Sequence, residues 1–172
     1  EYCNNAAQVD LTPFLLGTTS STTGGWQITP NVTDGVVGNN KLDPSALTAG
    51  DYSLKYALGN AGSNCRDSDS VSITILPILD PTITPPSPDT VCISLGTLPF
   101  VNTGDGGGVW SISNGGSIDA GTGVMALNSA GTYSVTYTLG TTCPVDSSVQ
   151  IVVEEPLDPT ISDPASLERA IS

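Results

Sequence analysis

Residues 130–143 read A-G-T-Y-S-V-T-Y-T-L-G-T-T-C, and residues 49–65 read A-G-D-Y-S-L-K-Y-A-L-G-N-A-G-S-N-C. Four large apolar residues stand at alternate positions of each stretch: Tyr133, Val135, Tyr137 and Leu139 in one, Tyr52, Leu54, Tyr56 and Leu58 in the other. Side chains at positions i and i+2 of a strand share one face, so each stretch predicts a strand with one face in a core. The same pattern present twice predicts two homologous repeats.

The similarity between the two copies continues on both sides of this strand. A glycine-rich turn leads to a lone tryptophan, Trp26 or Trp110, and a cysteine, Cys3 or Cys92, comes earlier still. A second cysteine follows the strand, and after a closing strand rich in Val and Ile both copies carry the tag L-D-P-T-I. The repeat therefore includes nearly the whole chain.

Short apolar runs rich in Thr, Val, Ile and Gly, separated by turns, are typical of β-sandwiches. We expect an all-β protein with two tandem Ig-like β-sandwich modules joined by a Pro-rich linker. The expected division is 1–78 for the first module, 79–89 for the linker, 90–156 for the second module and 157–172 for a further linker or tail. The linker contains four prolines, which favour extended and semi-rigid backbone.

Two cysteines per repeat, at equivalent places, predict two disulfides in a small module that buries little apolar surface. By the logic of the repeat the expected pairs are Cys3–Cys65 and Cys92–Cys143, one of three possible connectivities. Unpaired buried thiols are the alternative. A zinc site is disfavoured because the chain has no C-x-x-C pair and no His. Disulfides are typical of oxidising compartments, so we expect an exported protein on the cell surface or outside the cell.

The chain has 17 acidic and 4 basic side chains, which give a net charge of −13. Such a charge repels phosphate backbones and anionic lipid surfaces, so nucleic acid and a membrane surface are not expected partners. No run of 18 apolar residues predicts a membrane-spanning helix. The sequence begins without a signal peptide, two residues before a cysteine of the repeat, and we interpret it as a piece of a longer protein.

The order of Cys, Gly-x-Trp, A-G-x-Y-x-V-x-Y, Cys and closing strand resembles the Ig-like repeats of very large Bacteroidetes cell-surface adhesins, among them gliding-motility adhesins. The resemblance lies on Trp26, Trp110, Tyr52, Tyr56, Tyr133, Tyr137 and the four cysteines. It implies a structural or adhesive segment of a surface filament, whose partners are neighbouring repeats of the same chain and an extracellular ligand such as surface polysaccharide. The spacing fits neither the Cys–Trp–Cys pattern nor the tyrosine corner of antibody domains.

The sequence contains no pattern typical of an enzyme. The absence of His excludes Ser-His-Asp and Cys-His sites, and paired cysteines are not free nucleophiles. Glu154 and Glu155 are adjacent at a strand end and face opposite sides. The glycines of residues 104–108 are followed by no Lys, so we interpret them as a turn before Trp110 and not as a phosphate loop.

Two kinds of binding site are weaker candidates. The carboxylates of Asp34, Asp43, Asp67 and Asp69 could bind calcium, although no D-x-D-x-D-G loop is present and no other cofactor is expected. An accessory carbohydrate-binding or spacer module of a secreted hydrolase is the alternative function. Carbohydrate binding requires a row of exposed aromatic rings, whereas one tryptophan at the same place in each repeat indicates a core position.

Overall fold

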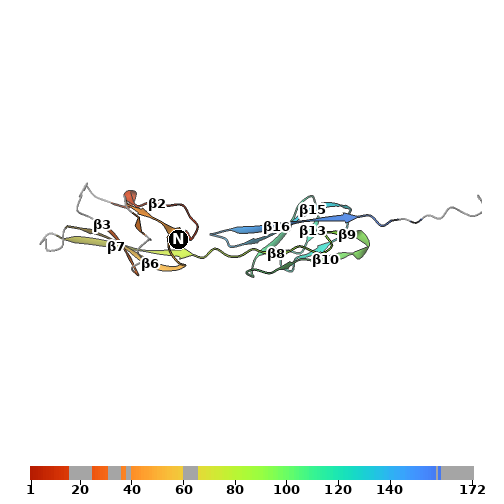
Figure 1. The fold of residues 1–172 in the computed structure, drawn as a ribbon, viewed down its shortest axis with the longest axis horizontal. Helices are drawn as coiled ribbons and strands as arrows, with labels where there is room; N and C mark the ends of the chain where they lie inside the picture. Colours follow the sequence, from red (N-terminus) through yellow and green to blue (C-terminus); the bar gives the residue numbers. More distant parts are fainter. Residues whose placement is uncertain (16–24, 31–35, 38–39, 60–65, 158, 160–172) are drawn as a thin grey trace, which may run out of the picture. The chain divides into compact units, whose positions relative to one another are not determined.

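The computed structural model of the chain describes residues 1–15, 25–30, 36–37, 40–59, 66–157 and 159 (Figure 1). In these ranges the chain forms β-strands and three short 3-10 turns, without an α-helix. Consequently, the described ranges contain no helix with the length and apolarity needed to span a membrane. The predicted all-β class is confirmed.

The chain divides into two compact units, and the loop Gly140–Val145 of the second repeat belongs to the first unit. The first unit consists of Glu1–Asp80 and Gly140–Val145, and the second of Pro81–Leu139 and Asp146–Ser172. The module boundaries and the Pro-rich linker expected from the sequence stay predictions. Most of the linker or tail expected at 157–172 lies outside the described residues.

The first unit contains a four-stranded sheet in the order β1-β7-β6-β3 and a three-stranded sheet in the order β2-β5-β4. Its elements are β1 (Tyr2–Cys3), β2 (Val9–Asp10), η1 (Thr12–Phe14), β3 (Gly25–Thr29), β4 (Val36–Val37), β5 (Lys41–Leu42), η2 (Pro44–Ala46), β6 (Gly50–Leu58) and β7 (Asp67–Leu76). The two long strands β6 and β7 are antiparallel from Gly50 opposite Ile75 to Leu58 opposite Asp67 (Figure 1).

The core of the first unit draws on both of its sheets, as in a sandwich. Of the four residues of the β6 alternation, Tyr52 and Leu54 are buried, whereas Tyr56 and Leu58 are half-buried. One cluster of buried side chains joins Tyr52 and Leu54 to the rest: Leu11, Ile28, Leu42, Leu47, Tyr52, Leu54 and Ile75. Because Leu42 comes from the smaller sheet and Ile28 from the larger one, the core lies between the two sheets.

The second unit contains sheets of four, three and two strands, in the orders β12-β15-β16-β9, β10-β14-β13 and β11-β8. Its elements are β8 (Ile83–Thr84), β9 (Thr90–Cys92), η3 (Ile93–Leu95), β10 (Thr97–Pro99), β11 (Val101–Asn102), β12 (Val109–Ile112), β13 (Ser117–Ile118), β14 (Val124–Ala126), β15 (Gly131–Leu139) and β16 (Val145–Glu154). All four apolar residues of the β15 alternation are buried, with Val135 completely inaccessible and the others at most 4% exposed.

The larger sheets of the two units have the same construction. Each orders its strands as an N-terminal strand, the closing strand, the Tyr-x-Leu/Val-x-Tyr strand and the tryptophan strand. The tryptophan faces the second tyrosine of its neighbour in both, Trp26 opposite Tyr56 and Trp110 opposite Tyr137. The N-terminal strand is parallel to the closing strand in both. The sequence repeat is thus also a repeat of topology and register.

Candidate functional site

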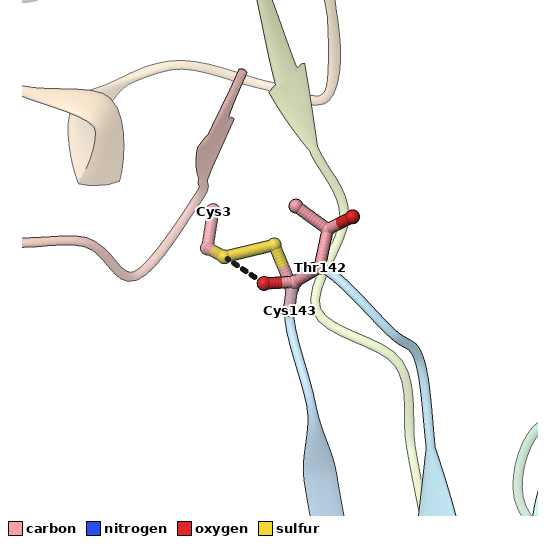
Figure 2. Close-up of a disulfide and its surroundings, with 3 residues drawn as sticks. All are labelled: Cys3, Thr142 and Cys143. Carbon is pink, nitrogen blue, oxygen red and sulfur yellow. Dashed lines mark hydrogen bonds between the residues drawn. A yellow bond between two sulfur atoms is a disulfide. The ribbon is translucent and has the colours of Figure 1, made fainter.

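The chain contains a disulfide between Cys3 and Cys143, which are 140 residues apart (Figure 2). Cys3 ends β1, and Cys143 lies in the loop between the end of β15 and the start of β16. The Cα atoms are 5.6 Å apart and the sulfur atoms 2.00 Å, which is ordinary disulfide geometry. Sγ of Cys3 also lies 3.8 Å from the carbonyl oxygen of Thr142, a contact without a hydrogen because a disulfide sulfur carries none.

This bond contradicts the pairing expected from the repeat. The predicted pairs Cys3–Cys65 and Cys92–Cys143 are both wrong, because Cys3 and Cys143 are bonded to each other. Cys92 is a free, half-buried thiol. Cys65 lies outside the described residues.

Strand geometry explains why the pairing within the second repeat fails. Cys92 lies opposite Glu154, the last residue of β16, whereas Cys143 precedes Val145, the first residue of that strand. A strand of this length spans about 30 Å, and a disulfide requires Cα atoms no more than about 7 Å apart. The two cysteines of the second repeat are therefore at opposite ends of one strand and cannot bond.

The free thiol of Cys92 occupies the position that Cys3 occupies in the first repeat. In the sheet, Cys3 lies opposite Leu76 of the closing strand β7, and Cys92 lies opposite Glu154 of the closing strand β16. Positions 76 and 154 correspond, because both come three residues before an L-D-P-T-I tag. The Sγ of Cys92 accepts a hydrogen bond of 3.0 Å from the Ser94 hydroxyl.

The loop that carries Cys143 is shaped by a glycine. Gly140 has a φ of +77°, and a Cβ added there would lie 2.8 Å from the carbonyl oxygen of Cys143. Left-handed backbone and a contact this short are both costly for any residue with a Cβ. Gly59, the glycine that ends the corresponding strand of the first repeat, has a φ of +88°.

Replacing Gly140 by Ala should therefore destabilise the chain by about 1–3 kcal/mol, the range of backbone strain. Urea unfolding followed by far-UV circular dichroism measures the difference. Gly106→Ala is the matched control, because a Cβ at that loop glycine meets nothing within 4 Å. Equal stability of the two variants would show that the Cys143 loop does not depend on glycine.

The aromatic residues expected in the core have different degrees of burial in the two repeats. Trp110 is 4% exposed, with its ring centroid 4.6 Å from that of Tyr137 and 6.2 Å from that of Phe100. Trp26 is half-buried beside Tyr56, at a centroid distance of 5.1 Å. Its buried Nε1 has no hydrogen-bond partner within the described ranges.

The remaining two core tyrosines form the same interaction in both repeats. The hydroxyl of Tyr52 donates to the carbonyl oxygen of Thr48 at 2.9 Å, and that of Tyr133 donates to the carbonyl oxygen of Ser129 at 3.0 Å. A tyrosine at the start of a strand that bonds to backbone a few residues upstream is the interaction of a tyrosine corner. The spacing to the second cysteine differs from that of antibody domains, as expected, but the hydrogen bond of a tyrosine corner is present in both repeats.

The structure describes three of the four carboxylates considered for calcium, Asp43 at η2 and Asp67 and Asp69 on β7. Asp43 caps η2, where it accepts bonds of 2.6 Å from the Ser45 hydroxyl and 3.0 Å from the Gln8 amide. These bonds, that of Ser45 first, hold the pKa of Asp43 below its usual value. Asp67 and Asp69 are exposed at the start of β7, and Asp34 lies outside the described residues. The described ranges contain no group of three or more metal-ligating side chains.

No protein-family model and no curated protein sequence matches this chain. Among solved structures, mouse cadherin-23 repeats EC22-24 align at 15% identity over 77% of this chain, with a TM-score of 0.30. SGBP-B of the Bacteroides ovatus mixed-linkage glucan utilization locus, in complex with a mixed-linkage heptasaccharide, aligns at 16% over 89%, with a TM-score of 0.32. The insect immune protein hemolin aligns at 17% over 69%, with a TM-score of 0.34. The chain spans 52%, 42% and 32% of those three chains, respectively.

Proposed function

We propose that this chain is a pair of non-catalytic repeats from a long filament on a cell surface, in which it acts as a disulfide-bonded spacer or weak binding segment. The observation that carries the proposal is the shared strand order and register of the larger sheets in the two units. A protein that builds the same module twice, with the same tag after each, has the construction of a repeat array. No catalytic role is part of the proposal.

The resemblance of the sequence supports a more specific assignment. Its motifs resemble those of Bacteroidetes surface adhesins such as the gliding-motility adhesin SprB, and we propose that the parent protein is of this kind. On this proposal the parent protein is exported and remains at the cell surface, where the disulfide fits an oxidising environment. Its partners are neighbouring repeats and an extracellular ligand such as surface polysaccharide.

The exposure of the aromatic rings favours the spacer over a carbohydrate-binding module. Sugar platforms need aromatic rings that face solvent, but Trp110, Tyr133 and Tyr137 are each at most 4% exposed. Within the described ranges Phe14, at 58% exposure, is the one aromatic residue among the exposed large hydrophobic side chains. One phenylalanine does not form a row of rings.

Antibody fragments raised against this chain test the proposal on cells that make the parent protein. Intact cells should be labelled without permeabilisation, and monovalent fragments should reduce attachment of the cells to a surface several-fold. Fragments against an unrelated surface protein serve as the control. Labelling that appears only after permeabilisation would contradict the proposal.

Affinity electrophoresis separates the spacer from the carbohydrate-binding alternative. The mobility of the chain should be unchanged in gels that contain soluble mixed-linkage β-glucan, xylan or mannan, relative to a reference protein that binds no sugar. Retardation that a Phe14→Ala variant loses would support the alternative instead.

A further inference from the structure

We infer that Cys92 is the site of a disulfide to the repeat that follows this segment in its parent chain, with its partner in the loop that corresponds to the Cys143 loop. The inference rests on the proposed function in one respect, since it requires a following repeat. A disulfide between successive repeats is a separate property, because a surface filament can exist with or without it.

Cys3 and Cys92 occupy equivalent positions in their repeats. Both end a short N-terminal strand that is parallel to the end of the closing strand, opposite residues 76 and 154 at corresponding positions. Cys3 is bonded to a cysteine in the loop before the closing strand of the next repeat. The chain therefore contains one complete example of a bond from the first cysteine of one repeat to the second cysteine of the next.

Cys92 cannot reach a disulfide partner inside its own repeat. Cys143 is already bonded to Cys3, and β16 separates it from Cys92 by about 30 Å of strand. Cys92 thus has the backbone setting of a bonded cysteine, without its partner among the described residues.

The chain around Cys92 exposes apolar surface. Cys92 is half-buried, and Leu95, three residues later, is 59% exposed. An exposed apolar side chain of this size, at the end of the 3-10 turn that Cys92 precedes, is a surface that a following repeat would cover. The tag L-D-P-T-I that follows the first repeat also follows the second, so the sequence provides for another repeat at the same spacing.

The bond forms by thiol–disulfide exchange with an external disulfide such as oxidised glutathione. The thiolate of Cys92 attacks one sulfur of glutathione disulfide, and one glutathione leaves as thiolate. The thiolate of the following repeat then attacks Sγ of Cys92 in this mixed disulfide and releases the second glutathione. Two protein thiols are oxidised, and one glutathione disulfide is reduced to two thiols.

The test supplies the missing repeat. Residues 1–161 are followed directly by a second copy of residues 84–172, so that Ile161 precedes Thr84 as Ile83 does in the natural chain. Cys65 is replaced by Ser throughout, because it lies outside the described residues and could compete. The original chain with Cys65→Ser is prepared in parallel, and both are refolded in a glutathione redox buffer.

Labelling of the denatured, non-reduced proteins with a maleimide counts the free thiols. The original chain should carry one thiol, that of Cys92. The lengthened chain should also carry one, from the appended copy of Cys92, whereas it would carry three if the inferred bond did not form. Non-reducing peptide mapping should find Cys3 with Cys143, and Cys92 with Cys143 of the appended copy.

Two controls keep the result interpretable. Cys143→Ser in the appended copy alone should raise the count to two thiols, both from copies of Cys92. Far-UV circular dichroism and urea unfolding of the lengthened chain show that the appended repeat is folded. A folded, lengthened chain in which Cys92 remains a thiol, or bonds to a cysteine of its own repeat, overturns the inference. The surface labelling of cells is unaffected by this outcome, so the two proposals can fail separately.

Discussion

Removing the disulfide through the double substitution Cys3→Ser and Cys143→Ser should lower the free energy of unfolding of the chain by about 5 kcal/mol. The bond closes a loop with a sequence separation of 140 residues, and the loop-entropy model gives about this value for such a length. The expected effect arises in the unfolded chain, which regains the freedom that the cross-link removes. Urea unfolding in non-reducing buffer, followed by circular dichroism, measures the loss.

Cys92→Ser is the matched control for this experiment. It exchanges the same atom at the corresponding position of the second repeat, where no disulfide is present. We expect its free energy of unfolding to remain within about 0.5 kcal/mol of that of the unmodified chain. A large loss from Cys92→Ser, together with a small loss from the double substitution, would show that the bond between Cys3 and Cys143 is not the native one.

Trp110→Ala should destabilise the second unit by about 3–5 kcal/mol, as for other large aromatic residues cut back in a core. The indole is 4% exposed and packs on Tyr137 and Phe100. A Cβ at Gly123 would lie 2.7 Å from the indole, so the backbone at residue 123 packs directly against the ring. Urea unfolding followed by circular dichroism gives the free energy.

Trp26→Ala is the comparison, because Trp26 holds the corresponding position in the first repeat but is half-buried. We expect a smaller loss than for Trp110→Ala. Each variant keeps a single tryptophan, so the tryptophan fluorescence reports the unfolding of the repeat that was not mutated. Acrylamide that quenches Trp110 as freely as a solvent-exposed indole would contradict the burial on which both expectations depend.

The strands and their inward faces were predictable because a period of two residues carries that information locally. The alternation of Tyr133, Val135, Tyr137 and Leu139 is enough to predict a strand with one buried face, and the structure buries all four. The tyrosine corner was missed because its position was measured from a cysteine. The structural reference is the start of the strand, where Tyr52 and Tyr133 bond to backbone four residues upstream.

The disulfide pairing of the cysteines was not predictable from the repeat. Comparison of two copies shows which cysteine corresponds to which, as for Cys3 and Cys92, but not where each lies along the closing strand. The parallel pairing of β9 with the far end of β16 decides that point. Such pairing joins residues about 60 positions apart, and no local pattern in the sequence specifies it. A chemically reasonable pair within one repeat was therefore geometrically impossible.

The disulfide also limits how far the chain can be stretched. When the two ends are pulled apart, tension passes from Cys3 directly to Cys143 through the sulfur atoms, and the backbone between them carries none of it. Only the two residues before Cys3 and the twenty-nine after Cys143 can then lengthen, to at most about 110 Å at full extension. The same chain with the bond reduced could reach about 600 Å. Oxidation thus limits the length that this segment can reach under load, even where its domains unfold.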